Sequence, residues 1–435
     1  MSDRRSAAAG QAGRPLPEFL GEEPARLLAF GRQAVSPDGG FGWLDHHGRI
    51  DPTMPRHLYI TGRITHSFAL GSLLGLEGAN ELAAHGIRSL RTVFVEPSGL
   101  GWCAALPGAE SPGDPSRSAY ATSFVVLAAA SGAIAGIPGA QGLLADSLVA
   151  VDSLFWSEQD GAVREDDQPD PIDGPGYRGL NSNMHMVEAY LAAYSAGAGE
   201  LYRDRAERIT RRAVTAAAQN SWRLPEHFDA RWTPLLDHHH DHREDPFRPY
   251  GSTVGHWLEW SRLLLHLESA VGDGVATGAP VSVDPTTVDS APTGLDWMRT
   301  AAVTLFDRAI TEGWSVDGQK GFVYTVDWRG QPVVRRRLHW VTAEAISAAA
   351  TLFAVTGDPE YAVWRDRWVT FAREHLVDHE RGSWHHELDP QNQPSPLIKQ
   401  GKADVYHSLQ AMLMAGMPDL PVRAGLAAAL AERLS

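Results

Sequence analysis

Gly251-Ser-Thr-Val-Gly-His-Trp-Leu-Glu-Trp260 begins with a glycine turn that ends at His256, where a helix begins. Glu259 follows His256 by one helical turn, so we expect the two side chains to share a face. A carboxylate beside a histidine can fix its tautomer and its orientation near neutral pH. A satisfied buried histidine would show the same pattern, but Trp257 and Trp260 add aromatic walls that suit the apolar faces of a sugar.

A second segment places three polar residues on one face of another predicted helix. Asn181, His185 and Glu188 fall at i, i+4 and i+7. Together these side chains donate and accept hydrogen bonds, which suits the recognition of hydroxyl groups. His-x-x-Glu alone is a weak signal for a metal ligand pair.

Two further segments combine histidine with a charged residue. Asp404-Val405-Tyr406-His407 opens a helix near the C-terminus, with Asp404 as its N-cap. Arg63 and His66 lie in an early helix. We expect these two segments, the segment around His256 and the one around His185 to meet at the centre of one ring of helices.

Helical periodicity dominates the rest of the chain. The pattern predicts thirteen helices, at 23–35, 57–75, 79–95, 119–135, 139–155, 183–196, 200–219, 254–270, 294–312, 340–356, 359–378, 403–416 and 421–434. Between pairs of helices lie short aromatic loops with Asp and Gly, as in Gly39–Trp43, Gly99–Trp102 and Gly321–Tyr324. These loops recur about every 60 residues, and such a period indicates a repeated unit, here a helical hairpin present about six times.

Six helical hairpins can stack as an open solenoid or close into a toroid in which alternate helices line the inside. The period alone does not decide between them. Loops that carry glycine, aromatic residues, His and Asp suit the mouth of a shared cavity and favour closure. We therefore predict an all-α fold, an (α/α)6 barrel of about twelve helices with short β-hairpin-like loops at one mouth.

The domain organisation follows from this repeat. Residues 1–16 have the composition of a disordered tail, and 17–435 are expected to form one catalytic domain. Residues 272–293 lack a helical period and are predicted to be a surface insertion. The connection 165–180, rich in Pro and Asp, could cover the opening of the ring.

Charge and composition exclude several classes of partner. The 435 residues carry 53 acidic and 38 basic side chains, a net charge of −15, and no basic stripe for nucleic acid beyond Arg335–Arg337. No apolar run approaches the length of a membrane span, and residues 1–16 lack the apolar core of a secretion signal. We expect a soluble cytoplasmic protein that acts on a small molecule as a monomer or homodimer.

The sequence predicts neither a metal nor a cofactor. Cys103 is the only cysteine, so the chain has no internal disulfide and no cysteine-based metal cluster. His-Glu-x-x-His is absent, and the histidines of loop 238–242 could bind metal weakly without any role. The dinucleotide fingerprint, the P-loop and the Gly-x-Ser-x-Gly elbow are missing as well, which argues against nucleotide cofactors and serine hydrolysis.

The chain resembles the N-acylglucosamine 2-epimerase superfamily, and within it the aldose–ketose isomerase branch. The resemblance runs from about residue 20 to 416 and includes the stretches Phe41–Leu44, His57–Arg63, Asn181–His185, Glu226–Asp229, Gly255–Trp260, Tyr324–Trp328 and Tyr406-His407. It implies an (α/α)6 barrel that interconverts sugars without a cofactor, by proton transfer through an enediol.

The resemblance also implies roles for individual residues. His256 and His407 would be the acid–base pair at the C1–C2 bond of the sugar, with Glu259 supporting His256. His185 and Arg63 would bind and polarise the oxygens there. Further wall and hydroxyl contacts would come from Tyr120, Asn181, Arg248, Trp340 and Glu344.

Independently of the resemblance, these residues suit proton transfer. Removing a proton next to an aldehyde needs a positioned base and a stabilised enediolate, and Arg63 is a permanent cation. One base on one face of the sugar suits isomerisation, whereas two bases on opposite faces suit 2-epimerisation. We favour D-mannose to D-fructose, with D-lyxose to D-xylulose as a related pair.

Several alternatives remain open. A 2-epimerase acting on mannose and glucose or on cellobiose would use the same residues, and a sulfoquinovose isomerase could draw its sulfonate site from Arg178 and Arg248. A glycoside hydrolase on the same barrel would need two carboxylic acids across the cavity, for which Glu188, Glu259 and Glu344 are available. A non-catalytic helical-repeat binding protein would have no need for the histidines.

Overall fold

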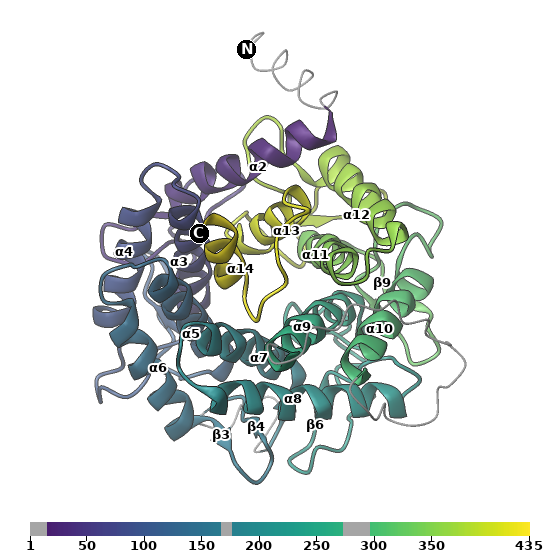
Figure 1. Cartoon of the computed structure of the whole chain (residues 1–435), viewed down its shortest axis with the longest axis horizontal. Coiled ribbons are helices and arrows are strands. Elements are labelled where there is room, and N and C mark those ends of the chain that lie inside the picture. Colours follow the sequence, from purple (N-terminus) through teal and green to yellow (C-terminus); the bar gives the residue numbers. More distant parts are fainter. Residues whose placement is uncertain (1–14, 167–175, 273–295) are drawn as a thin grey trace.

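The computed structural model describes residues 15–166, 176–272 and 296–435, which form two concentric rings of helices (Figure 1). The inner ring consists of α3 (Leu58–Leu73), α5 (Ala119–Ile134), α7 (Leu180–Ser195), α9 (Val254–Gly272), α11 (His339–Thr356) and α13 (Tyr406–Gly416). The outer ring consists of α2 (Leu16–Gly31), α4 (Ala79–Thr92), α6 (Ala140–Leu154), α8 (Glu200–Gln219), α10 (Trp297–Gly313) and α12 (Pro359–Phe371). Inner and outer helices alternate along the chain, as the hairpin repeat predicts.

The inner ring is closed. Each inner helix packs against the next one in the chain, and α13 packs against both α11 and α3. This closure confirms the predicted (α/α)6 toroid and rules out the open solenoid. Composition explains which helices lie inside: α5 is apolar or small on every side and almost wholly buried, whereas α8 buries one stripe and exposes its charged residues.

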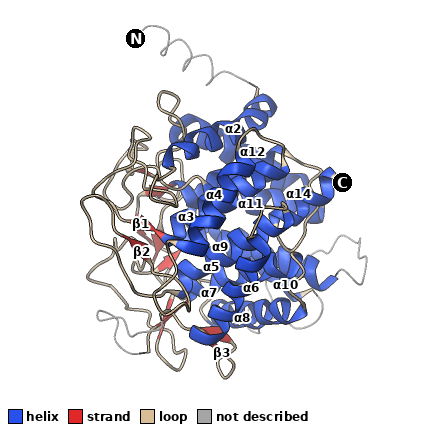
Figure 2. Cartoon of the chain, turned by 90° about the vertical axis from the view of Figure 1, so that its left-hand side faces the viewer, coloured by secondary structure: helices blue, strands red, loops and turns tan. Residues whose placement is uncertain are grey.

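Short strands gather at one end of the ring (Figure 2). They form the antiparallel pairs β1 (Arg56–His57) with β2 (Ala105–Leu106), β3 (Trp156–Ser157) with β4 (Ala162–Val163), β5 (Arg178–Gly179) with β6 (His227–Phe228), and β10 (Arg337–Leu338) with β11 (Glu387–Leu388). A three-stranded group joins β7 (Ser252–Thr253), β8 (Thr325–Val326) and β9 (Pro332–Val334). The predicted loops with hairpin character at one mouth are thereby confirmed.

These strands fix the starts of the inner helices. β1, β5, β7 and β10 run directly into α3, α7, α9 and α11, and each pairs with the loop that follows the next outer helix. The register of β5 on β6, for example, pairs Gly179 with His227 one residue before α7 begins. Side chains in the first turns of the inner helices are consequently held at the mouth by a hydrogen-bonded frame.

The opposite end of the ring is closed by the last helix, α14 (Leu426–Leu434), which packs against α3, α5 and α7. Figure 1 shows it in the middle of the ring beside the C-terminus. The barrel is therefore a cup whose open side carries the strands.

All thirteen predicted helices are present among the described residues, with notable shifts at the ends of three of them. The helix predicted at 421–434 begins at Leu426. α2 begins at Leu16 rather than at 23. Pro17 does not prevent this earlier start, because it lies in the first turn, where a missing N–H costs no hydrogen bond. In the helix predicted at 359–378, the α-helical part ends at Phe371, and a π-helical turn, Ala372–Leu376, follows it directly. A 3₁₀ turn, Arg32–Ala34, follows α2.

Three predicted features fall wholly or partly outside the described residues. They are the N-terminal tail at 1–16, apart from its last two residues, the insertion at 272–293, apart from Gly272, and the middle of connection 165–180. Of the helices that the structure describes, none combines the length and the apolar character needed to cross a bilayer.

Candidate active site

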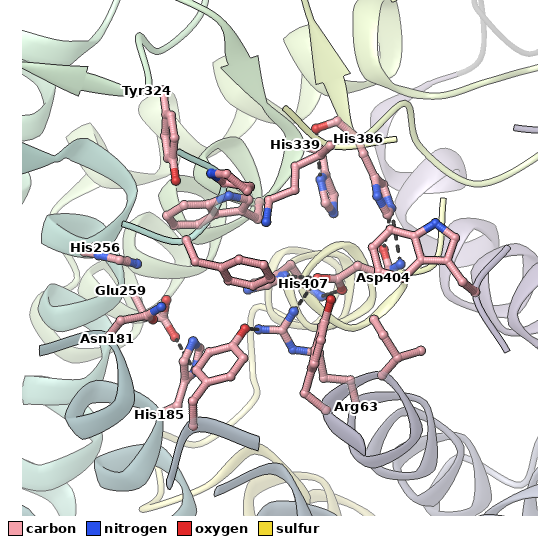
Figure 3. Close-up of a pocket in the computed structure, with 18 residues that line it drawn as sticks. Arg63, Asn181, His185, His256, Glu259, Tyr324, His339, His386, Asp404 and His407 are labelled. Atoms are coloured by element: carbon pink, nitrogen blue, oxygen red, sulfur yellow. Dashed lines mark hydrogen bonds and ion pairs between the residues drawn. The ribbon is translucent and has the colours of Figure 1, made fainter. Parts of the chain in front are cut away.

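A pocket lies at the open mouth of the barrel, and every inner helix contributes to its lining (Figure 3). The contributing side chains come from the first turns of these helices or close to them. One from each helix, in chain order, gives Arg63, Tyr120, His185, His256, Trp340 and His407, and Asn181, Glu259 and His339 also belong to the lining. The structure thus brings to one cavity segments that lie up to more than 300 residues apart in the sequence and that were predicted to meet.

Asp404 connects a base and a cation on one wall of this pocket. Its Oδ2 lies 2.8 Å from Nδ1 of His407 and accepts a 2.8 Å hydrogen bond from Nη1 of Arg63. Burial acts to raise the pKa of Asp404, but His407 and Arg63 outweigh it and hold that pKa well below its usual range. The carboxylate is therefore ionised, and His407 donates from Nδ1, which leaves Nε2 as its free acceptor.

The backbone around Asp404 explains why this arrangement is rigid. Its Oδ1 accepts from the backbone N–H of Tyr406 at 3.0 Å, as expected of an N-capping side chain at the start of α13. One carboxylate therefore caps the helix and orients the histidine on that helix. The sequence identified the cap but not the contact with Arg63, which joins positions 341 residues apart.

His256 has a carboxylate partner of its own, which is not the predicted one. Its Nδ1 lies 2.9 Å from Oε2 of Glu226, a residue of the loop before β6. Glu226 also accepts from the backbone N–H of Thr253 at 3.3 Å, so the loop is tied to the start of α9. The predicted support of His256 by Glu259 is wrong, because Glu259 faces α7 instead, with Oε1 3.5 Å from Nδ1 of His185.

The ring of Trp340 lies near both histidines. Its ring centroid is 5.1 Å from that of His256 and 6.0 Å from that of His407. A Cβ on Gly255 would overlap the Trp340 ring, so only glycine at this position lets the indole lie beside the first turn of α9. Trp340 therefore provides the aromatic wall that was expected of Trp257 and Trp260, which are buried in the core.

Arg63 is held in an aromatic surround. Its Nη2 donates to the Tyr120 hydroxyl at 3.1 Å, and its guanidinium lies 4.3 Å from the ring centroid of Phe124 and 5.1 Å from that of Tyr406. Such contacts stabilise a desolvated cation. Burial opposes its charge, but neighbouring tyrosines and Asp404 raise the pKa of Arg63, so it is a permanent cation in the pocket.

His185 is a neutral imidazole. Burial, followed by the positive charge of Arg63 and by the other pocket histidines, lowers its pKa well below the ordinary value. Its ring lies edge-on to Tyr120, with centroids 5.3 Å apart. A neutral histidine at this position can donate one hydrogen bond to a substrate oxygen without adding charge to the site.

Glu344 and Glu188 do not line the pocket. Both belong to a buried cluster beside its floor, where Arg262 donates to Glu344 at 2.9 Å and to Glu188 at 3.2 Å. The Tyr406 hydroxyl also donates to Glu188. The predicted contact of Glu344 with the substrate is therefore not supported by its position.

Asn181 lines the pocket as predicted, whereas Arg248 lines a neighbouring, larger cavity. The guanidinium of Arg248 lies 4.5 Å from the ring centroid of Tyr177. Phe247, Asn181 and His256 are among the residues that line both cavities, so the two cavities adjoin each other. His66, expected at the centre, lies deeper in the barrel and hydrogen-bonds Ser131 at 2.7 Å.

Several lining residues were not singled out by the sequence. His339 and His386 stack at 4.1 Å, with Nε2 of His386 beside the backbone of Asp404. The Lys399 ammonium lies 4.0 Å from the ring centroid of Phe247, and burial, followed by the charge of Arg63, lowers its pKa to about 8. These residues sit in loops or at positions with no helical motif, so no local pattern distinguishes them.

The charges of the pocket disfavour a cation. Ligand atoms of His339, Asp404 and His407 lie within 4.8 Å of one another, close enough to share an ion. The same Asp404 oxygen that would bind it already accepts from Arg63, whose positive charge would repel it. The donor set therefore fits proton transfer and hydrogen bonding better than metal coordination.

The contact between Glu226 and His256 leads to a first prediction. We expect Glu226→Gln to lower kcat about 10- to 100-fold with little change in KM, because an amide can no longer fix the tautomer of His256 in the same way. Steady-state kinetics on the variant and on Glu244→Gln, an exposed carboxylate, would check this. Equal kinetics for the two variants would contradict the role of Glu226.

Comparison with known proteins places the chain among sugar-converting enzymes. The sequence profile of the family N-acylglucosamine 2-epimerase (GlcNAc 2-epimerase) matches residues 39–411. The chain is 45% identical over 416 residues to a D-mannose isomerase of Thermobifida fusca, which covers 95% of this chain and 96% of the relative. It is 40% identical over 415 residues to a D-mannose isomerase of Pseudomonas cannabina pv. alisalensis, with 95% of each chain covered. A crystal structure of a D-mannose isomerase superposes with a TM-score of 0.79 at 26% identity, covering 92% of this chain and 97% of the other.

Proposed function

Because the chain belongs to the N-acylglucosamine 2-epimerase family and is an aldose–ketose isomerase, we propose that it interconverts D-mannose and D-fructose. The observation that carries the proposal is the pairing of His407 with an ionised carboxylate that also holds Arg63. His407 as the base, Asp404 as the anion that orients it and Arg63 as a permanent cation then lie together in a pocket with an aromatic wall. Identity to two D-mannose isomerases over almost the whole chain supports this choice of substrate.

In the proposed reaction, the open-chain sugar lies with C1 and C2 beside His407. Nε2 of His407 removes the proton from C2, and the ionised Asp404 stabilises the imidazolium that forms. Negative charge develops on the sugar oxygens, where Arg63 and the neutral His185 donate hydrogen bonds. The same imidazolium returns the proton to C1, and the aldose has become a ketose.

His256 has a different part in this scheme. Its ring lies beside Trp340 in the same pocket as His407, and its carboxylate partner Glu226 leaves Nε2 able to exchange a proton with a hydroxyl. We assign it the transfer of protons to and from the sugar oxygens, including the opening of the sugar ring. The planar Trp340 provides a surface for the apolar face of the substrate.

A 2-epimerase is the second candidate, and one observation favours it. Both His256 and His407 carry their own carboxylate, so either could act as a carbon base. If both reached C2 from opposite faces, the proton would return to C2 and D-mannose would give D-glucose. The early products distinguish the two outcomes.

Product analysis tests the proposal. We expect purified protein, supplied with D-mannose alone, to give D-fructose as the main early product in 13C NMR spectra, and D-lyxose to give D-xylulose. D-Glucose as the main early product would replace the proposal by 2-epimerisation. Turnover of sulfoquinovose but not of mannose, or cleavage of a disaccharide, would overturn it in favour of the sulfonate-binding or the hydrolytic alternative.

A further inference from the structure

We propose that Glu259 is a positioning residue, kept as a neutral carboxylic acid, whose proton fixes the tautomer of His185 so that the imidazole presents Nε2–H to the substrate. The proposal rests on the proposed function only for the last part, the hydrogen bond to a sugar oxygen. The protonation of Glu259 and the tautomer of His185 are properties of the protein without substrate.

Charge balance around Arg262 is the first argument. Three carboxylates surround this one guanidinium, at 2.9 Å for Glu344, 3.2 Å for Glu188 and 3.5 Å for Glu259. All four side chains are buried. Three ionised carboxylates against one cation would leave two excess negative charges out of water, which is prohibitively costly, so the cluster takes up a proton.

The contacts show which carboxylate holds this proton. Glu188 accepts from both Arg262 and the Tyr406 hydroxyl, and these contacts outweigh its burial and lower its pKa. Glu344 accepts the shortest bond from Arg262. Glu259 has the longest of the three distances to the guanidinium. Burial, followed by repulsion from Glu344, raises the pKa of Glu259 well above its ordinary value.

Unsatisfied atoms on both sides point to the same pairing. Oε1 of Glu259 and Nδ1 of His185 are buried, and neither has a hydrogen-bond partner among the described residues. They lie 3.5 Å apart (Figure 3). Nη2 of Arg262, which is also buried without a hydrogen-bond partner among the described residues, lies 3.5 Å from the same Oε1. A buried polar atom without a partner is costly, so a shared proton stabilises both groups.

The direction of this hydrogen bond decides what His185 offers the substrate. If Glu259 is the acid, it donates to Nδ1, and the neutral ring carries its hydrogen on Nε2. If Glu259 were ionised, Nδ1 would carry the hydrogen and Nε2 would be an acceptor, which repels an oxyanion. Only the first arrangement adds a second donor beside Arg63 for the developing enediolate.

The other ionisable groups around Glu259 come from every inner helix packed against it. They are His256 and Arg262 on α9, His185 and Glu188 on α7, Glu344 on α11, Tyr406 and His407 on α13, Arg63 on α3, and Tyr120 on α5. Arg63 and Arg262 act to ionise Glu259, while burial and the two neighbouring carboxylates oppose ionisation. A neutral Glu259 beside a neutral His185 satisfies this balance.

The test on the unaltered protein is the tautomer of His185. In protein labelled with 15N-histidine, the signals lost in His185→Asn identify this ring, and its two 15N shifts show which nitrogen carries hydrogen. We expect the Nε2–H form at pH 7 without sugar. The Nδ1–H form, or an imidazolium, would overturn the proposal, and neither result depends on mannose being the substrate.

Isosteric variants provide the kinetic test. Glu259→Gln keeps a donor at the same place, so we expect it to retain kcat within about threefold of wild type, whereas Glu259→Ala lowers kcat about 10- to 100-fold with a similar KM. The pH profile of kcat/KM should be the same for wild type and Glu259→Gln. A profile displaced to lower pH in Glu259→Gln would show that a negative charge had been removed and would overturn the proposal. Thermal melts establish that both variants fold.

Discussion

Replacing His407 by Asn lowers kcat for the conversion of D-mannose to D-fructose by about 10²- to 10⁴-fold, the range expected for the loss of a general base. The amide of Asn can still donate to Asp404, so the buried carboxylate keeps a partner and the fold is preserved. What disappears is the Nε2 acceptor that takes the C2 proton. KM should change by less than about threefold, because little binding energy is removed.

Two measurements accompany this variant. His240→Asn, at a half-exposed histidine of the loop before β7, is the matched control and should retain wild-type kinetics. Thermal melts should place His407→Asn within a few degrees of wild type. A variant that folds normally and retains more than about a tenth of wild-type kcat would show that His407 is not the carbon base.

Replacing Arg63 by Met affects both activity and stability. The enediolate loses its cation, so we expect kcat to fall about 10²- to 10³-fold. Asp404 also loses one of its two side-chain partners in a site where both members of the ion pair are buried. Removing one member of such a pair costs about 3–5 kcal/mol in the free energy of unfolding, which denaturant titration measures.

Two comparison variants separate charge from geometry. Arg63→Lys keeps the charge but cannot reach Asp404 and Tyr120 at the same time, so its kcat should lie between wild type and Arg63→Met. Arg49→Met removes an arginine whose side chain is 74% exposed, and should change stability by less than about 1 kcal/mol. Equal stability losses at Arg63 and Arg49 would contradict the account of the buried ion pair.

Local patterns in the sequence predicted the helices and the identity of the histidines. Hydrophobic periodicity located every inner and outer helix, because each must bury a stripe or its whole surface within the barrel. The motif around His407 was equally local, since Asp404 caps the helix and reaches the histidine three residues later. The closure of the ring could be inferred only from the character of the loops.

Partners that come from other helices could not be predicted. Glu259 shares a helix face with His256, yet in the ring that face is turned toward α7, where His185 is the neighbour. Glu226 reaches His256 across 30 residues, through a loop whose path no sequence period describes. Glu344 lies one helical turn after Trp340, as a pocket residue would, but its carboxylate accepts a hydrogen bond from Arg262 in the buried cluster.

The most direct test of the proton-transfer account is the conversion of D-mannose in D2O by the wild-type protein, followed by 1H and 2H NMR. The account predicts that part of the fructose formed early carries solvent deuterium at C1, because the imidazolium of His407 can exchange its proton with solvent before it delivers a proton to C1. Fructose in which the C2 hydrogen has moved wholly to C1, with no deuterium incorporated, would indicate direct hydride transfer and contradict the account.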